Sequence, residues 1–233
     1  MLAITSNRLL ISTLAMALLF NSYKETESPS VDVYETSAQG NALKKISTAS
    51  AGENPVIIKL KPEEKFQTIT GFGGSFTEAS ASLLNKLSKA KRDKILQAYF
   101  GEDGARYSLT RTHINSCDFS LSNYAYAMKP DDKTLDSFSI DADRDDLIPM
   151  IKEARRISKD GFKIIASPWT APPWMKDNND WRGGKLLPQY RETWVLYFSK
   201  YINAYKKEGM NILGVTVENE PLSNDKNWES MHF

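Results

Sequence analysis

The sequence predicts an α/β fold in which short parallel strands alternate with helices. Two observations support this prediction. First, strand and helix patterns alternate along residues 66–233, which indicates a parallel sheet with right-handed crossover connections. Second, Phe162–Ala166 is a short continuous apolar run, as expected for a strand covered on both faces.

The composition is that of an ordinary globular chain. The 233 residues include 30 Lys and Arg against 29 Asp and Glu, which gives a formal charge of +1. This near-neutral balance, with no basic stripe, argues against a nucleic-acid partner. The single cysteine, Cys117, and two histidines make a Cys/His zinc site very improbable, and we expect no metal.

A targeting segment is predicted at residues 1–24. Arg8 precedes Leu9–Phe20, a nearly unbroken apolar run of about a dozen residues. Such a run is too short to span a bilayer comfortably, and it matches the apolar core of a secretory signal. An uncleaved anchor is the alternative. We expect a signal peptide, no stable membrane span, and a secreted or periplasmic protein.

Residues 25–65 are predicted to contribute short antiparallel strands ahead of the main domain, which covers residues 66–233. Alternating or β-rich patterns occur at Val31–Thr36, Ala42–Ile46 and Val56–Leu60, and turn residues separate them.

Four strands and four helices are expected in the main domain. The strands are Phe66–Ile69, Ser108–His113, Phe162–Ala166 and Ile212–Val217. The helices are Glu78–Leu87, Lys89–Tyr99, Asp143–Lys159 and Glu192–Lys207. Apolar side chains recur at helical spacing in the last two helices, and the acidic start of the third suits the helix dipole.

Polar, aromatic or Gly/Pro-rich segments follow all four predicted strands, at residues 71–78, 111–119, 167–174 and 218–221. In parallel α/β folds the functional side chains gather at the carboxyl ends of the strands. These segments supply carboxylates, an amide and indoles. Indoles stack on sugar rings, and carboxylates and amides hydrogen-bond to hydroxyl groups. The set therefore predicts a neutral, polyhydroxylated substrate.

The glycine-rich segment Gly71–Gly74 could suggest phosphate binding. It matches neither the P-loop pattern nor the dinucleotide-binding pattern, so we do not expect a nucleotide. We expect the glycines to form a tight turn that brings the backbone close to a ligand.

Strand alternation assigns roles to the two glutamates after the fourth strand. Side chains of a strand point to opposite faces in turn, so Thr216, Glu218 and Glu220 are expected to face the interior. Glu220 then lies at the rim, where a raised pKa would suit a general acid. Glu218 lies deeper, and we expect it to be a structural carboxylate paired with Arg111.

Four ordered motifs carry a family resemblance: GFGGSFTEA from Gly71, RTHINSCDFS from Arg111, SPWTAPPWMK from Ser167, and ENEP from Glu218. Together they resemble glycoside hydrolase family 30, which includes glucosylceramidases. The resemblance covers the chain from about Val31 and implies a (β/α)8 TIM barrel with a β-sandwich side domain, of which this chain holds the N-terminal half. It also implies retaining hydrolysis of β-glycosides, without metal or other cofactor.

The resemblance also implies roles for individual residues. Glu220 matches the general acid/base, and Asn219 matches the residue that contacts the sugar 2-hydroxyl. The other substrate-binding or pocket-shaping positions that it implies are Glu78, Arg111, Trp169 and Trp174, with His113 and Asp118 as further candidates.

No residue of the chain matches the nucleophile of this family, which is a glutamate after the seventh strand. A retaining glycosidase needs that second carboxylate, so we expect an incomplete site that is inactive alone. The main alternatives are a non-catalytic carbohydrate-binding or pseudoenzyme fragment, and a family 30 β-xylosidase, β-fucosidase or β-1,6-glucanase. A half-barrel that self-associates through its sheet edges is a third hypothesis, which the sequence disfavours. The oligomeric state stays open.

Overall fold

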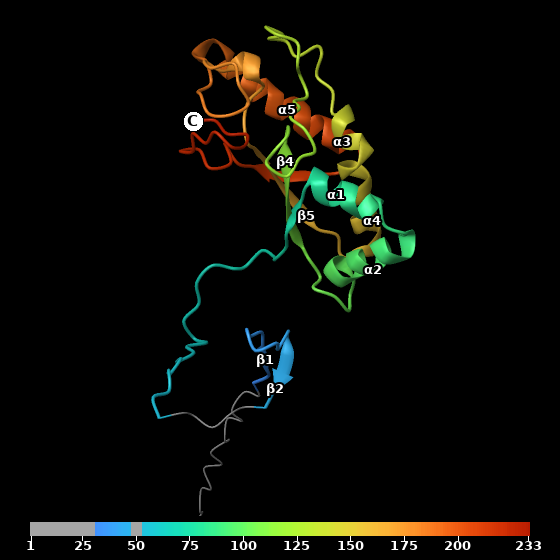
Figure 1. Cartoon of the computed structure of the whole chain (residues 1–233), viewed down its shortest axis with the longest axis vertical. Helices are drawn as coiled ribbons and strands as arrows, with labels where there is room; N and C mark the ends of the chain where they lie inside the picture. The colour runs from blue at the N-terminus through green and yellow to red at the C-terminus, as the bar shows by residue number, and fades with distance from the viewer. Residues whose placement is uncertain (1–30, 48–52) are drawn as a thin grey trace, which may run out of the picture. The chain divides into compact units, whose positions relative to one another are not determined.

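The computed structural model describes residues 31–47 and 53–233, which fall into two units divided between Lys65 and Phe66 (Figure 1). The predicted signal peptide, residues 1–24, lies outside the described residues. No helix in the described part of the chain is long and apolar enough to cross a membrane.

The first unit contains one antiparallel strand pair. β1 (Val33–Glu35) pairs with β2 (Lys44–Ile46), with Val33 opposite Ile46. The strand predicted at Val56–Leu60 is wrong. That segment has no regular secondary structure and joins no ladder, and its apolar side chains stay in solvent, with Val56 90% exposed.

The second unit is built on a four-stranded parallel sheet in the order β3-β4-β5-β6. The strands are β3 (Ser75–Phe76), β4 (Leu109–Ile114), β5 (Lys163–Pro168) and β6 (Ile212–Val215). In this sheet Phe76 pairs with Thr112, His113 with Ser167, and Ala166 with Val215. The predicted parallel sheet is confirmed, and its carboxyl ends share one edge.

The first strand of this sheet is not where the sequence predicts it. Residues 66–69 are not a strand, and β3 begins after the glycine-rich segment. Leu109 N–H donates to Phe72 O at 3.2 Å, and Arg111 N–H donates to Gly74 O at 3.1 Å. A Cβ on Gly73 would lie 1.6 Å from Leu109 O. The glycines therefore let two backbones approach each other, and the tight turn predicted at residues 71–74 does not form.

Helices connect consecutive strands. They are α1 (Glu78–Asn85) and α2 (Lys89–Phe100) after β3, α3 (Asp141–Asp145) and α4 (Leu147–Ile157) after β4, and α5 (Arg191–Lys207) after β5. Two short 3-10 turns, η1 (Pro173–Met175) and η2 (Pro188–Tyr190), lie between β5 and α5. In Figure 1, α1, α2 and α4 lie together on one side of β4 and β5.

The helix predicted at Asp143–Lys159 is two helices. The break falls at Asp146, whose φ of −129° and ψ of −54° lie outside the helical range. Pro149 explains the break, because a proline cannot donate to the carbonyl four residues earlier and its ring collides with it.

The core lies between the sheet and its helices. Fully buried side chains come from β5 (Ile164, Ala166), α4 (Leu147, Ile151) and α5 (Tyr197, Tyr201). The opposite face of the sheet is polar. There the side chains of Arg111 and Thr216 both donate hydrogen bonds to Ser167 Oγ. This polar face leads to the strand exits.

Candidate functional site

The segment after β6 carries the two glutamates. The strand ends at Val215, so the pleat does not continue to Glu220 as predicted. Asn219 N–H donates to Pro168 O at 2.7 Å, which holds the segment beside the end of β5. Glu220 is exposed and has a φ of +50°, a left-handed conformation that is uncommon for glutamate. Glu220 therefore lies in a bend that follows β6 and does not continue the strand.

Arg111 links three strand exits. Its Nε donates to Ser167 Oγ at 2.9 Å, and its second terminal nitrogen, Nη2, donates to Asn219 Oδ1 at 2.8 Å. The guanidinium carbon lies 4.7 Å from the centre of the Trp169 ring, within cation–π distance. Arg111, Trp169 and Asn219 therefore form one cluster.

The carboxylates of Asp118 and Glu220 act on the charge of this guanidinium. Burial lowers the pKa of Arg111, and the nearby charges of Asp118 and Glu220 act in the opposite direction. The guanidinium remains charged, because its ordinary pKa lies far above neutral pH. A fixed cation therefore lies within electrostatic reach of Glu220.

The predicted pairing of Arg111 with Glu218 is wrong. Arg111 bonds to Ser167 and Asn219, and neither carboxyl oxygen of Glu218 has a hydrogen-bond partner among the described residues. Glu218 is only 5% exposed, and this burial raises its pKa well above the ordinary range, while the charge of Lys176 opposes the rise.

Lys176 is a buried residue that sequence reasoning missed. Its Nζ donates to Thr170 Oγ1 at 2.8 Å, to Asp180 O at 2.7 Å and to Ser230 O at 3.0 Å. Burial lowers the pKa of Lys176 to about 8. The sequence around Lys176 does not predict that its side chain is buried. The oxygens that accept its hydrogen bonds belong to Thr170, Asp180 and Ser230, and no local pattern links these positions to the lysine.

The two remaining residues predicted to bind substrate, Glu78 and Trp174, lie in different parts of the fold. Glu78 opens α1 beside the turn that contains Asp118, and its Oε2 accepts from Leu121 N–H at 3.0 Å. Trp174 instead belongs to the packing of the β5–α5 connection. Its indole donates to Ala127 O at 2.9 Å and its ring packs edge-on against Tyr190.

A cavity of about 280 Å³ lies at the exits of β3, β4 and β5. Its walls include Thr77, Arg111, His113, Phe119 and Trp169. This volume is near the lower end of the range for small-molecule clefts. Polar and aromatic side chains from three strand exits therefore line one cavity.

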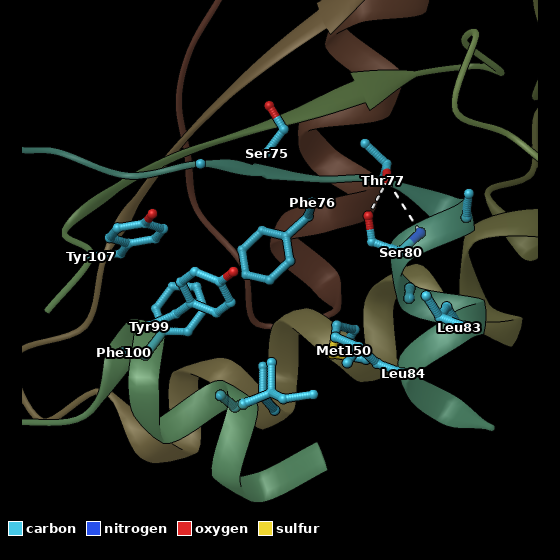
Figure 2. A pocket seen from close by; sticks show the side chains of 15 residues that line it. Ser75, Phe76, Thr77, Ser80, Leu83, Leu84, Tyr99, Phe100, Tyr107 and Met150 are labelled. Carbon is cyan, nitrogen blue, oxygen red and sulfur yellow. Dashed lines mark hydrogen bonds between the residues drawn. The ribbon is translucent and has the colours of Figure 1, made fainter. Parts of the chain in front are cut away.

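A larger cavity of about 550 Å³ lies elsewhere, between β3, α1 and α2 (Figure 2). Figure 2 shows Phe76, Tyr99, Phe100 and Met150 around it, and its lining is mainly apolar. None of the predicted site residues lines this cavity. Its size alone does not make it the candidate site, because no acidic, basic, histidine or cysteine side chain lines it.

Asp143 is the second feature that sequence reasoning missed. It is 1% exposed, and its carboxylate accepts hydrogen bonds from the hydroxyls of Tyr124, Tyr126 and Tyr205 at 2.7–2.8 Å. Burial raises the pKa of Asp143, while its hydrogen bonds act in the opposite direction. This network ties the 115–140 connection to α5. Among the described residues, no group of three or more His, Cys, Asp or Glu side chains could hold a metal.

Comparisons with known proteins agree on one family. Residues 69–233 match the model of the glycosyl hydrolase family 30 TIM-barrel domain. The lysosomal acid glucosylceramidase of Mus musculus is 37% identical over 200 residues, covering 82% of this chain and 39% of that protein. The endo-1,6-beta-D-glucanase of Neurospora crassa is 31% identical over 197 residues, covering 80% of this chain and 41% of that protein.

Solved structures give the same result. SrfJ from Salmonella typhimurium matches with a TM-score of 0.72 at 35% identity, covering 84% of this chain and 44% of that chain. The endo-beta1,6-glucanase BT3312 matches with a TM-score of 0.72 at 31% identity, covering 87% and 45%. The chain spans less than half the length of these relatives. With its four parallel strands and crossover helices, the chain has the N-terminal half of a (β/α)8 barrel, as predicted.

Proposed function

Because the chain belongs to glycosyl hydrolase family 30, we propose that its strand exits form the acid/base side of a retaining β-glycosidase site. Glu220 is the general acid/base in this proposal. The observation that carries it is the Arg111–Asn219 hydrogen bond, which fixes the residue next to Glu220 against the exits of β4 and β5. β-Glucosides are the proposed substrates, in line with the relatives named as glucosylceramidases and β-1,6-glucanases.

The hydrogen bonds of Asn219 define what it can offer a sugar. A guanidinium only donates, so Oδ1 is the acceptor in this contact and the side-chain NH2 remains to donate. This donor can bind the oxygen of a sugar 2-hydroxyl. Trp169, held by Arg111, offers an indole face for the sugar ring.

The proposed reaction has two steps. A carboxylate nucleophile attacks the anomeric carbon while Glu220 protonates the leaving oxygen. Glu220 then removes a proton from the water that hydrolyses the glycosyl-enzyme. The nucleophile must lie about 5–5.5 Å from Glu220, and we propose that barrel strands beyond the four of this chain supply it. The chain alone is then inactive.

Hydrolysis of 4-nitrophenyl β-glucoside by the purified chain tests the inactivity. We expect no release of nitrophenol above that of the Glu220→Gln variant. Turnover by the chain that Glu220→Gln abolishes would overturn the proposed incompleteness, although it would support the role of Glu220.

A chimera tests the acid/base role. Residues 69–233 replace the matching part of the endo-beta1,6-glucanase BT3312, and Glu220→Gln is then introduced. We expect hydrolysis to fall about 100-fold or more for a poor leaving group and much less for 2,4-dinitrophenol, which leaves without protonation. An equal loss for both leaving groups would contradict the role.

Non-catalytic carbohydrate binding is the second candidate. It is favoured by the Arg111, Trp169 and Asn219 cluster, which is in place within these four strands. Calorimetry with gluco-oligosaccharides separates the two candidates, and no heat at millimolar ligand would remove the binding function.

We also propose that the protein is secreted or periplasmic, which N-terminal sequencing of the exported protein would test.

A further inference from the structure

A single buried lysine connects the segments that follow β5 and β6. Lys176 is only 2% exposed, and its Nζ donates three hydrogen bonds. One goes to Thr170 Oγ1 at 2.8 Å, just after β5, and one goes to Ser230 O at 3.0 Å, after β6. The third, to Asp180 O at 2.7 Å, stays within the connection that carries the lysine. The ammonium therefore joins the exits of two neighbouring strands.

The three hydrogen bonds use every donor of the Lys176 side chain. A lysine ammonium carries three N–H groups and no acceptor. Burial lowers the pKa of Lys176 to about 8, so the charged form still predominates at neutral pH. No donor is left for a ligand, and Lys176 does not line the 280 Å³ cavity. Any effect of this lysine on a bound sugar therefore acts through the segments that it holds.

Glu218 lies within electrostatic reach of the same ammonium. Burial raises the pKa of Glu218, and the positive charge of Lys176 opposes this rise. Glu218 stands two positions before Glu220 in the sequence. Lys176 is therefore coupled to the segment after β6 by charge as well as by its hydrogen bond to Ser230.

Residues 229–233 pack against the connection that contains the lysine. Ser230 N–H donates to Trp181 O at 3.2 Å, and His232 N–H donates to Gly184 O at 2.9 Å. The side chain of Ser230 is buried as well, at 3% exposure. The bond from Lys176 to Ser230 O is thus one of several that fix this stretch, and it is the one made by a charged donor.

The same stretch contacts the connection after β4. Asn123 Nδ2 donates to Glu229 Oε1 at 2.6 Å. Glu229 is only 5% exposed, and Met231 is fully buried. Residues 229–233 therefore lie among the strand exits rather than free in solvent.

Residues 229–233 in turn hold the backbone beside Glu220. Phe233 N–H donates to Pro221 O at 2.8 Å. On the other side, Asn219 N–H donates to the end of β5 at 2.7 Å. Glu220 is therefore fixed from both sides, and one of the two attachments depends on the stretch that the lysine holds.

We infer that Lys176 is a positioning residue: its ammonium holds residues 229–233, and through them residues 219–220, at the exit of β5. The acid/base candidate and its neighbouring amide then keep their places relative to Trp169, which also lies at this exit. The inference rests on the proposed function only for what the site binds.

Lys176→Met in the full chain tests the inference without a ligand, because it removes the three donors and keeps an unbranched side chain of similar length. We expect the backbone NMR signals of Asn219 and Glu220 to shift. A chemical shift reports the geometry around an amide in the folded state, so a loss of stability alone leaves it unchanged. Wild-type signals at both residues in Lys176→Met would overturn the inference.

Hydrogen exchange gives a second readout on the same variant. The Ser230 and His232 amides should exchange about tenfold or more faster in Lys176→Met, because residues 229–233 lose their charged donor. The amide of Leu96, buried in α2, should change much less. An equal rise at Leu96 would mean a general loss of stability, and it would overturn the positioning role.

Lys185→Met is the matched control. Lys185 belongs to the same connection but is exposed, and its Nζ makes no hydrogen bond to another described residue. Its replacement should change neither the NMR signals of residues 219–220 nor the exchange rates. Thr170→Val is a milder variant, which removes one of the three acceptors and decides the question if Lys176→Met does not fold. It should shift the same two signals, and wild-type signals there would contradict the inference.

Binding of cellobiose, measured by calorimetry, connects the positioning to the proposed site. Affinity should fall about tenfold in Lys176→Met and stay at the wild-type value in Lys185→Met. Unchanged affinity in Lys176→Met despite shifted signals at residues 219–220 would show that the lysine does not position the sugar-binding groups. Absence of binding in the wild type would count against the proposed function, while the NMR signals and exchange rates would still decide whether Lys176 positions residues 219–220.

Discussion

The guanidinium of Arg111 donates to Asn219 Oδ1 at 2.8 Å, across residues that are 108 positions apart in the sequence. The same guanidinium bonds to Ser167 and covers Trp169. A lysine could keep the charge but could not reproduce two directed hydrogen bonds from one planar group. Arg111 therefore sets the geometry of the proposed sugar site.

Arg111→Lys should weaken this site although the charge is kept. We expect it to lower the free energy of unfolding by about 1–3 kcal/mol, because Asn219 and Ser167 lose a charged donor. Gluco-oligosaccharide affinity should fall as well. Urea denaturation and calorimetry measure the two effects. Arg144→Lys, at an exposed ion pair, is the control and should change neither. Unchanged affinity in Arg111→Lys would show that Arg111 does not orient the sugar-binding groups.

Glu218 predicts a pH dependence of stability. Burial raises its pKa, so the folded state keeps a proton that the unfolded state loses above the ordinary glutamate pKa of 4.5. The contribution of Glu218 to the free energy of unfolding is therefore fully present below pH 4.5. It is lost as the pH rises through the raised pKa. We expect the free energy of unfolding to decrease between pH 5 and pH 7.

Glu218→Gln should remove part of this slope, since the amide does not titrate. Denaturation at several pH values provides the measurement. The pKa of Asp143 is also raised, so its ionisation also lowers the free energy of unfolding as the pH rises. We assign to Asp143 any pH dependence that remains in Glu218→Gln. Identical slopes in the wild type and in Glu218→Gln would contradict the assignment. Lys176, with a pKa of about 8, contributes only above this window.

Gly73 makes a sharp test of the contact between β3 and β4. An alanine Cβ there would lie 1.6 Å from Leu109 O, so one backbone would have to move. We expect Gly73→Ala to cost about 3 kcal/mol or more. Gly214→Ala in β6 is the control, because nothing lies within 4 Å of its Cβ position. Similar melting temperatures for the two variants would be inconsistent with this packing.

The sequence predicts the alternation of strands and helices well, because apolar periodicity and turn residues are local signals. It misplaces the first strand of the sheet, since the need for glycine at position 73 comes from a backbone 36 residues later in the chain. The partners of Arg111 were missed for a similar reason. The positive charge of Arg111 predicts a carboxylate as its partner, whereas the fold places the Ser167 hydroxyl and the Asn219 amide beside it.

Asp143 gives the last prediction, on the coupling between the 115–140 connection and α5. Asp143→Ala leaves three phenol hydroxyls without their acceptor in a buried site, so we expect a loss of about 3–5 kcal/mol. Tyr205→Phe removes only one of the three bonds and should cost about 1–2 kcal/mol. Chemical denaturation of both variants and of the double variant gives the coupling energy. In the double variant the cost should be less than the sum of the two, because the Tyr205 hydrogen bond is already lost in Asp143→Ala. Strict additivity would mean that the tyrosine and the carboxylate stabilise the fold independently.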